Sequence, residues 1–243
     1  MNQMISKVKR GIRKLILRHE ITTYFFSYSG EDAILQNIFN KKITNKQPGF
    51  YIDVGAYHPF NLSNTHLFYI NGWRGINIDA MPGSMKLFNR HRKRDINLEL
   101  AISDKAEKLV FYQYKEDSAN SFSKDFINKV QTTGGADYSV KKEITIYTHT
   151  LKEVLDKHLP AAQEIDFLSV DVEGMDFRVI LSNDWDKYRP KVVVVELLGQ
   201  TIKDIYDNEI TQFLEKLGYE VCAKTVIWKN LSSVFFIDSR YEF

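Results

Sequence analysis

Apolar positions along the chain alternate between short continuous runs and runs spaced three or four residues apart. Short runs, several of them solidly apolar, predict strands at 50–54, 74–79, 96–101, 166–171, 191–197, 219–224 and 232–238. The three-and-four spacing predicts helices at about 63–71, 83–93, 150–158, 175–182 and 205–217. This alternation of strands and helices predicts an open α/β sheet with helices on both faces, a three-layer sandwich.

The character of the strands indicates how they pair. VVVVELL, at 192–198, is almost entirely apolar, which is typical of strands covered on both faces in a parallel sheet. The last two predicted strands follow one another closely and are expected to form an antiparallel hairpin at one edge. One polar stretch, 114–143, interrupts the alternation and has Gly134-Gly135 in its middle. A long insert of this kind is usually a functional lid or a disordered loop.

The first 24 residues have a different pattern from the rest, which we take as one domain over 25–243. Apolar residues recur there at helical spacing with basic residues between them, so a basic amphipathic helix is expected. Two interpretations stay open. The helix packs on the domain or on a second subunit, or residues 1–22 dock on an anionic membrane surface as a peripheral anchor.

Composition narrows the class of protein. Of 243 residues, 44% are hydrophobic and 26% are charged, which is typical of a soluble globular domain. One cysteine, Cys222, excludes an internal disulfide framework and a cysteine-ligated zinc site, and favours a cytoplasmic location. Residues 1–20 contain six basic side chains and one acidic one, a charge of +5; since the whole chain carries +2, the remainder carries −3. A domain with that balance is a poor match for nucleic acid.

Carboxylates stand at or near most of the predicted strand ends: Asp53, Asp79, Asp104, Asp171 and Glu196. Ligands of open α/β sheets bind at the carboxyl ends of the strands. A single acidic residue there is often a helix cap, but several together are harder to explain in that way. A buried, unpaired charge is costly, so these carboxylates either have internal partners or face a ligand.

The first two strand ends indicate which ligand. Asp79 lies 24 residues after Gly55, where nucleoside-binding sheets hold ribose hydroxyls. The intervening turn, GAYHPF, has one glycine where a pyrophosphate normally needs three, and no Walker-type GK[ST] is present. An acidic site without a phosphate loop fits S-adenosylmethionine, which has a nucleoside, an ammonium group and a sulfonium but no phosphate.

Several segments together resemble the FkbM-type methyltransferases. They are YSGEDAIL (28–35), FYIDVGAYHPFNLSNT (50–65), GWRGINIDAMP (72–82), LAISD (100–104), TLKEVL (150–155) and IDFLSVDVEGMDFRVI (165–180). The resemblance implies a class I methyltransferase fold with a mostly parallel seven-stranded sheet and an antiparallel edge strand. It implies S-adenosylmethionine as methyl donor and O-methylation of a sugar, polyketide or related metabolite, often in polysaccharide biosynthesis.

On this resemblance and the strand-end positions we assign a set of candidate residues to the cofactor. They are Glu31, Asp53, Gly55, Ala56, Asp79, Ala80, Ile102, Ser103 and Asp171. Asp79 is expected on the ribose, and Ile102 and Ser103 beside the adenine. Glu31 is expected to reach the methionine ammonium or to cap a helix at 31–39.

Methyl transfer to a hydroxyl also needs a held acceptor and somewhere for its proton to go. The catalytic candidates are His58, Asp171 and Glu173, and the acceptor-binding candidates are Tyr57, Asn64 and Glu196. No metal is the first expectation. In the alternative, Asp171 and Glu196 end adjacent strands and hold Mg²⁺, which acidifies the acceptor.

The resulting hypothesis is an S-adenosylmethionine-dependent O-methyltransferase acting on a sugar hydroxyl of a glycan, nucleotide sugar or related metabolite. The alternatives are N- or O-methylation of a non-sugar small molecule, an NAD-dependent sugar-modifying enzyme and a non-catalytic binding module. No nucleic-acid partner is expected, and a homo-oligomer is left open. DVEG stands where a nucleic-acid methyltransferase would have Asn-Pro-Pro or Asp-Pro-Pro before an aromatic residue.

Overall fold

A computed structural model describes residues 24–130, 137–227 and 230–242. The predicted N-terminal helix, 1–24, falls almost entirely outside this part of the chain. No helix among the described residues is long and apolar enough to cross a membrane.

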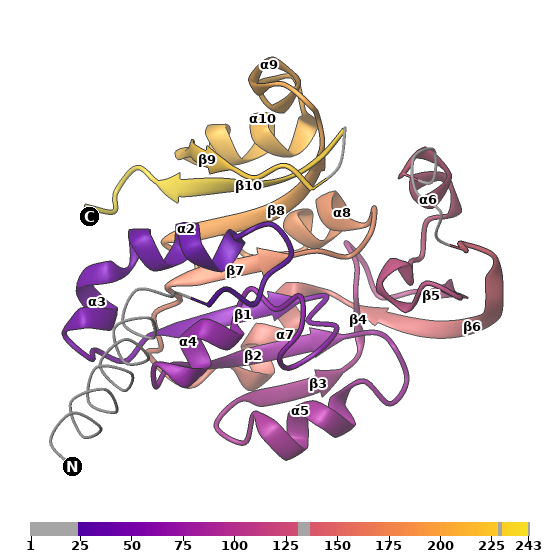
Figure 1. The fold of residues 1–243 in the computed structure, drawn as a ribbon, viewed down its shortest axis with the longest axis horizontal. Coiled ribbons are helices and arrows are strands. Elements are labelled where there is room, and N and C mark those ends of the chain that lie inside the picture. The colour runs from indigo at the N-terminus through magenta and orange to yellow at the C-terminus, as the bar shows by residue number, and fades with distance from the viewer. Residues whose placement is uncertain (1–23, 131–136, 228–229, 243) are drawn as a thin grey trace, which may run out of the picture.

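A seven-stranded sheet forms the centre of the molecule, in the order β3-β2-β1-β7-β8-β10-β9 (Figure 1). Its strands are β1 (Phe50–Val54), β2 (Arg74–Asp79), β3 (Ile96–Glu99), β7 (Phe167–Val170), β8 (Val192–Leu198), β9 (Tyr219–Lys224) and β10 (Leu231–Asp238). The pairs from β3 to β8 are parallel, and β10 is antiparallel to both β8 and β9. The predicted mostly parallel sheet and the antiparallel hairpin at one edge are therefore confirmed. The hairpin consists of β9, which is the edge strand, and β10, which lies between β8 and β9.

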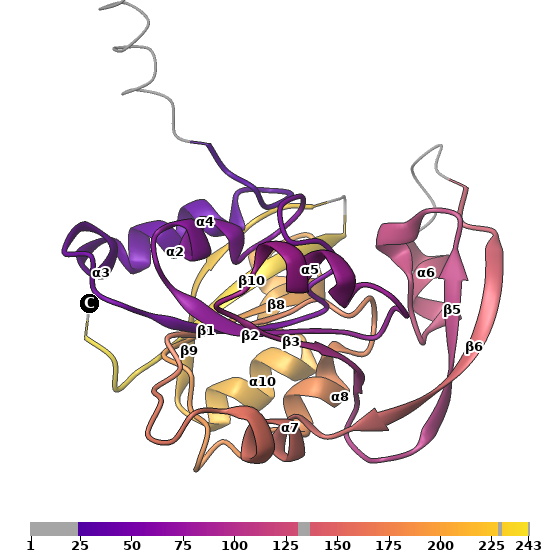
Figure 2. The same cartoon turned by 90° about the horizontal axis from the view of Figure 1, so that it is seen from below.

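Helices cover both faces of the sheet, as Figure 2 shows edge-on, with α2, α4 and α5 on one side and α7, α8 and α10 on the other. The described helices are α2 (Glu31–Ile38), α3 (Asn40–Thr44), α4 (His66–Ile70), α5 (Met85–His91), α6 (Lys124–Val130), α7 (Leu151–His158), α8 (Asp176–Leu181), α9 (Ile202–Tyr206) and α10 (Glu209–Lys216), with a 3₁₀ turn η1 (Asp117–Ala119). Each sheet face buries its own apolar cluster, because alternate side chains of a strand point to opposite faces.

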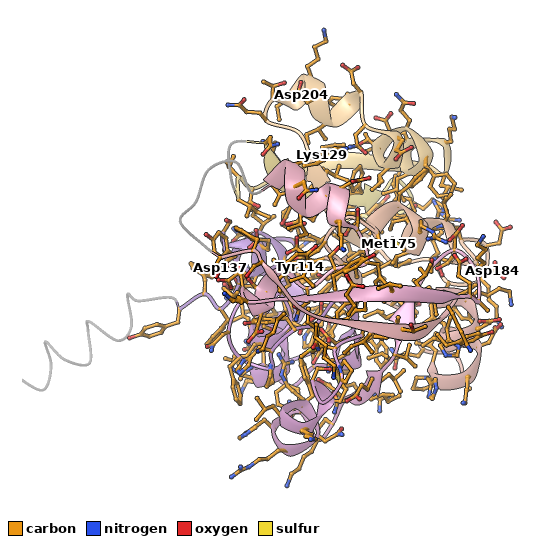
Figure 3. All side chains as sticks on the ribbon, turned by 90° about the vertical axis from the view of Figure 1, so that its right-hand side faces the viewer. Tyr114, Lys129, Asp137, Met175, Asp184 and Asp204 are labelled. Atoms are coloured by element: carbon orange, nitrogen blue, oxygen red, sulfur yellow. The ribbon has the colours of Figure 1, made fainter. Side chains whose placement is uncertain are left out.

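The insert has more regular structure than the sequence predicts. β4 (Ala101–Ile102), β5 (Lys108–Tyr114) and β6 (Val140–His149) form a second sheet in the order β4-β6-β5. The segment 114–143, expected as an irregular lid or disordered loop, contains η1, α6 and the start of β6. Figure 3 looks onto this face, where β5 and β6 cross the middle and α6, with Lys129, lies above them. The insert stands at the carboxyl ends of the parallel strands (Figure 1).

Candidate active site

A cavity of about 820 Å³ lies between the carboxyl ends of β1, β2, β7 and β8 and the insert. Its volume is within the range of small-molecule sites, about 300–1,000 Å³. Most of the predicted site residues line it: Glu31, Gly55, Tyr57, His58, Asn64, Asp79, Ala80, Ile102, Asp171, Glu173 and Glu196. Carboxylates that are far apart in sequence therefore meet in one place.

Asp53, Ala56 and Ser103 do not line this cavity, so contact of these three with the cofactor stays a prediction from sequence. Asp53 is buried and accepts a hydrogen bond from Thr65 Oγ1 at 2.9 Å. Ala56 packs in an apolar cluster of its own, and Ser103 Oγ donates to Asp104. Asp53 thus has an internal partner, and burial raises its pKa to about 6.

Gly55 allows β1 and β7 to approach each other where they end. Its φ is +87°, and a Cβ at this position would lie 1.7 Å from the backbone oxygen of Asp171. Only glycine fits both the left-handed conformation and the contact. The glycine that the sequence assigned to close approach of a ligand is thus required first by a contact within the protein.

Asp79 ends β2 with its carboxylate facing the cavity. Oδ2 accepts from the Tyr57 amide at 2.9 Å and Oδ1 from the Met81 amide at 2.8 Å. These bonds fix the carboxylate and leave it further acceptor positions, because each oxygen has two lone pairs. Burial raises its pKa, and the two amide bonds lower it. Tyr57, whose φ is +51°, is held in a strained conformation beside it and is 40% exposed.

His58 lines the cavity but is poorly arranged for the general-base role predicted for it. Its Nδ1 accepts from the amides of Phe60 at 3.2 Å and Asn61 at 3.1 Å. A neutral imidazole with Nδ1 as acceptor carries its proton on Nε2, so no nitrogen is free to accept another. Burial and the nearby His91 lower its pKa and favour this neutral form. The geometry suits a residue that positions the turn or donates a hydrogen bond.

Three carboxylates gather where β7 and β8 end. Asp171, Glu173 and Glu196 each offer an oxygen, and these three atoms lie within 4.8 Å of one another. Burial raises the pKa of all three, and the charges of their neighbours raise it further. Glu196 does not pair with Lys191 or Arg189, because those side chains bind Glu164, Asp166 and Asp238.

The turn after β7 holds Glu173 toward this cluster. Asp176, at the start of α8, accepts from the amides of Val172 at 3.1 Å and Gly174 at 3.0 Å. Glu173 itself has φ +53°, and its backbone oxygen accepts from Ser121 Oγ of the insert at 2.6 Å. The sequence motif DVEG is therefore a strained turn fixed from both sides.

Glu31 is anchored within the protein, although it also lines the cavity. Oε1 accepts from Thr225 Oγ1 at 2.8 Å and Ser233 Oγ at 3.2 Å, and Oε2 accepts from the Ser29 amide at 2.8 Å. The predicted helix-cap role is not observed, because the residue before α2 is Gly30 and no side chain caps the helix. These contacts join α2 to β10 and its neighbouring loop.

Asn64 is oriented by the floor of the site. Its Nδ2 donates to Ser169 Oγ of β7 at 3.1 Å, which leaves its amide oxygen available to the cavity. Ala80, directly after β2, and Ile102, in β4, also line the cavity. They offer backbone and apolar surface, as expected for the walls of a nucleoside site.

The insert contributes a wall that sequence reasoning missed. Cavity residues from it include Glu116, Asp117, Asn120, Phe122 and Tyr138. The signals that could have found the strands are the apolar run LVFY at 109–112 and the alternation EITI at 143–146. Among the described residues, Lys86 is the one lysine or arginine of the lining, against seven carboxylates: Glu31, Asp79, Glu116, Asp117, Asp171, Glu173 and Glu196. The site is built for a cationic ligand.

The sheet order, the antiparallel β10 and the cavity at the strand ends define a class I methyltransferase fold. The family model of the methyltransferase FkbM domain matches residues 53–221, and the chain belongs to this family. It is therefore a methyltransferase, and the family implies use of S-adenosylmethionine.

Solved structures similar to this chain include a methyltransferase FkbM from Methylobacillus flagellatus, with a TM-score of 0.48 and 9% identity over 78% of this chain. This chain spans 43% of that protein's length. A putative RNA methyltransferase from Pyrococcus horikoshii has a TM-score of 0.37 and 8% identity, covering 84% of this chain and 81% of its own. A precorrin-6y C5,15-methyltransferase from Geobacter metallireducens has a TM-score of 0.37 and 15% identity, and the match covers 83% of this chain and 87% of that protein. No curated protein matches.

Proposed function

We propose that this chain transfers a methyl group from S-adenosylmethionine to a hydroxyl of a sugar in a glycan, nucleotide sugar or related metabolite. The observation that carries the proposal is one acidic cavity at the carboxyl ends of the parallel strands. We call Asp79 and the turn after β1 its first part, and the carboxylates after β7 and β8 its second part. We assign the donor to the first part and the acceptor to the second.

The residues of the first part fit the methyl donor. Its ammonium and sulfonium groups match an acidic lining, and its ribose hydroxyls match the acceptor positions left on Asp79. Ala80 and Ile102 offer apolar contact to the adenine. When bound, S-adenosylmethionine supplies an electrophilic methyl group. In the described part of the lining Lys86 is the one lysine or arginine, so the pyrophosphate of NAD and nucleic acid match it poorly.

The second part suits a hydroxyl-rich acceptor. Asp171 and Glu173 line the cavity, and as carboxylates they can accept hydrogen bonds from hydroxyls and take up the acceptor's proton. Tyr57 is a half-exposed aromatic wall, and Asn64 presents its amide. Enclosure by the insert keeps water from competing with the acceptor. A non-sugar small molecule with a hydroxyl is the second candidate.

The first test is binding of the methyl donor. Isothermal titration calorimetry is expected to give a micromolar Kd for S-adenosylmethionine and none for NAD. Asp79→Ala is expected to weaken binding at least about tenfold, the loss of one charged hydrogen-bonding group. Asp104→Ala is the matched control, because Asp104 pairs with Arg178 and does not line the cavity. Equal affinity of Asp79→Ala and wild type would contradict the ribose assignment.

The second test is methyl transfer itself. Labelled S-adenosylmethionine is incubated with a panel of nucleotide sugars, oligosaccharides and non-sugar alcohols. Label in a sugar ether supports the proposal. Donor binding without label in any sugar, together with label in a non-sugar alcohol, would move the assignment to the second candidate.

A further inference from the structure

The carboxylates of Asp171, Glu173 and Glu196 have the spacing of ligands to one ion. Hard divalent cations lie about 2.0–2.6 Å from their oxygen ligands, so two oxygens on opposite sides of one ion are about 4–5 Å apart. The three oxygens here lie within 4.8 Å of one another. None of these distances exceeds what one ion can span, so all three oxygens can be its ligands without rearrangement of the strands.

The cluster has no positive partner within the described residues. Oε2 of Glu196 is buried and accepts no hydrogen bond, and the whole residue is only 7% exposed. Neither Asp171 nor Glu173 forms a side-chain ion pair in the described ranges, and the nearest charges that raise the pKa of Asp171 are those of Asp176, Glu31 and Asp53. An unpaired buried carboxylate is costly, and three together also repel one another.

The turn that carries Glu173 has a strained backbone and is fixed by contacts with its surroundings. Glu173 keeps a left-handed backbone, with φ +53°, between the bonds to Asp176 and the bond from Ser121. A Cβ on Gly174 would lie 2.4 Å from Phe126 of the insert, so α6 presses the turn into place. Strain of this kind persists where the surroundings fix it, and it is often found at functional sites.

We propose that Asp171, Glu173 and Glu196 bind one hard divalent cation, Mg²⁺ or Mn²⁺. The ligand set is oxygen only, which suits these ions and disfavours zinc or copper. Glu196 supplies the buried ligand, and Asp171 and Glu173, both partly exposed, form the side through which the ion enters. Neutralising the cluster removes the repulsion that the apo site carries.

The cation also gives the second part of the cavity a chemical task. A hydroxyl bound to a divalent cation is more acidic than a free one, so it loses its proton more readily. This role rests on the proposed function, whereas binding of the ion does not.

The test is Mn²⁺ binding to the full chain, followed by electron paramagnetic resonance without any methyl donor or acceptor. One Mn²⁺ per chain is expected at concentrations on the order of 0.1–1 mM or below. Glu196→Gln is expected to weaken binding at least about tenfold, and Asp171→Asn similarly. Mg²⁺ is expected to displace Mn²⁺ from the same site.

Glu116→Gln is the matched control, since Glu116 is another carboxylate of the cavity wall outside the three-residue cluster. It is expected to bind Mn²⁺ as wild type does. The proposal is overturned if wild type binds no Mn²⁺, or if Glu196→Gln, shown to be folded by its thermal transition, binds it equally well. Because the readout needs no turnover, failure of the cation site and failure of sugar methylation are told apart.

Discussion

At the scale of single residues, the carboxylates of the strand ends differ in what satisfies them. Asp53 and Asp176 are satisfied by hydrogen bonds within the protein, and Asp79 is satisfied in part. Glu196 has an oxygen, Oε2, that accepts no hydrogen bond from any described residue. A carboxylate that receives enough hydrogen bonds from the protein therefore supports the fold. A carboxylate that receives too few remains able to bind a ligand.

The raised pKa of Asp53 makes it a pH-dependent cost to stability. Burial is the main cause, and the hydrogen bond from Thr65 only partly offsets it. The Asp53 carboxyl binds a proton more tightly in the folded chain than in the unfolded chain, where its pKa is near the ordinary 3.8. Stability from this residue is therefore greatest at low pH and is lost as pH rises through about 6.

Asp53→Asn imitates the protonated form at every pH. Its free energy of unfolding is expected to gain on wild type by about 1.5 kcal/mol between about pH 5 and about pH 7.5. Urea unfolding of both proteins at the two pH values, without cofactor, measures this. A difference between the two proteins that stays constant with pH would show that Asp53 does not titrate in this range.

Substitutions at Gly55 and Gly72 separate two reasons why stability requires glycine: the close contact between β1 and β7, and the left-handed backbone conformation. Gly72 has nearly the same φ, +89° against +87°, but nothing lies within 4 Å of its Cβ position. Gly72→Ala is expected to cost roughly 1–2 kcal/mol, the strain of a left-handed alanine. Gly55→Ala is expected to cost at least about 2 kcal/mol more, because its Cβ meets the Asp171 carbonyl. Equal losses in urea unfolding would mean that the strand ends can move apart.

At the scale of elements, the site is held together by contacts between segments that the chain connects only distantly. Glu31 joins α2 to Ser233 of β10 across 202 residues of sequence. Ser121 joins the insert to the turn after β7. These side-chain hydrogen bonds fix the positions of α2 and of the insert, which line the cavity but do not pair with the central sheet.

Replacing Glu31 with alanine is expected to destabilise the protein by roughly 2–4 kcal/mol, because it removes three hydrogen bonds and leaves buried hydroxyls without partners. Glu99→Ala is the control. Glu99 also accepts a hydrogen bond, from the Gly83 amide, but at an exposed position, and its loss is expected to cost less than about 1 kcal/mol. Urea unfolding compares the two. A loss at Glu31 no larger than at Glu99 would mean that α2 does not depend on this anchor.

At the scale of the whole molecule, charge is divided between two parts of the chain. Residues 1–20 carry +5 and the rest −3, and the cavity concentrates seven carboxylates. The domain itself is therefore expected to be repelled by anionic membranes, and any attraction belongs to the basic N-terminal segment. That segment lies outside the described residues, so membrane docking stays a prediction from sequence.

Deleting residues 1–22 separates the two parts. The shortened chain is expected to lose binding to vesicles that contain anionic lipid, while its Kd for S-adenosylmethionine stays the same. Co-sedimentation with anionic and with neutral vesicles measures the first, and calorimetry measures the second. Unchanged sedimentation with anionic vesicles would remove the membrane hypothesis and leave packing on protein as the role of this segment.

Much of the sheet could be predicted because its signals are local. The limits of β1 and β2 agree with the predicted 50–54 and 74–79. A short apolar run marks β1, and Ile76 and Ile78, between Gly75 and Asp79, mark β2. The insert could not be predicted in the same way. β6 is mostly exposed and has polar side chains at six of its ten positions, so it lacks the continuous apolar run that marks β1 and β8. β5 has an apolar run, but its partner β6 lies about 25 residues further along the chain, beyond α6.

The sequence by itself determined the strands and the acidic strand ends, which depend on local patterns, and the family, which depends on several motifs in order along the chain. It also predicted that Asp171 and Glu196 end adjacent strands. Only the tertiary structure decided that Glu173 joins them and that Asp53 does not. Asp53 and Asp171 read alike in sequence, yet Thr65 satisfies one and no described side chain satisfies the other. The direction and partners of a side chain depend on packing between segments far apart in the chain, and no local pattern contains that information.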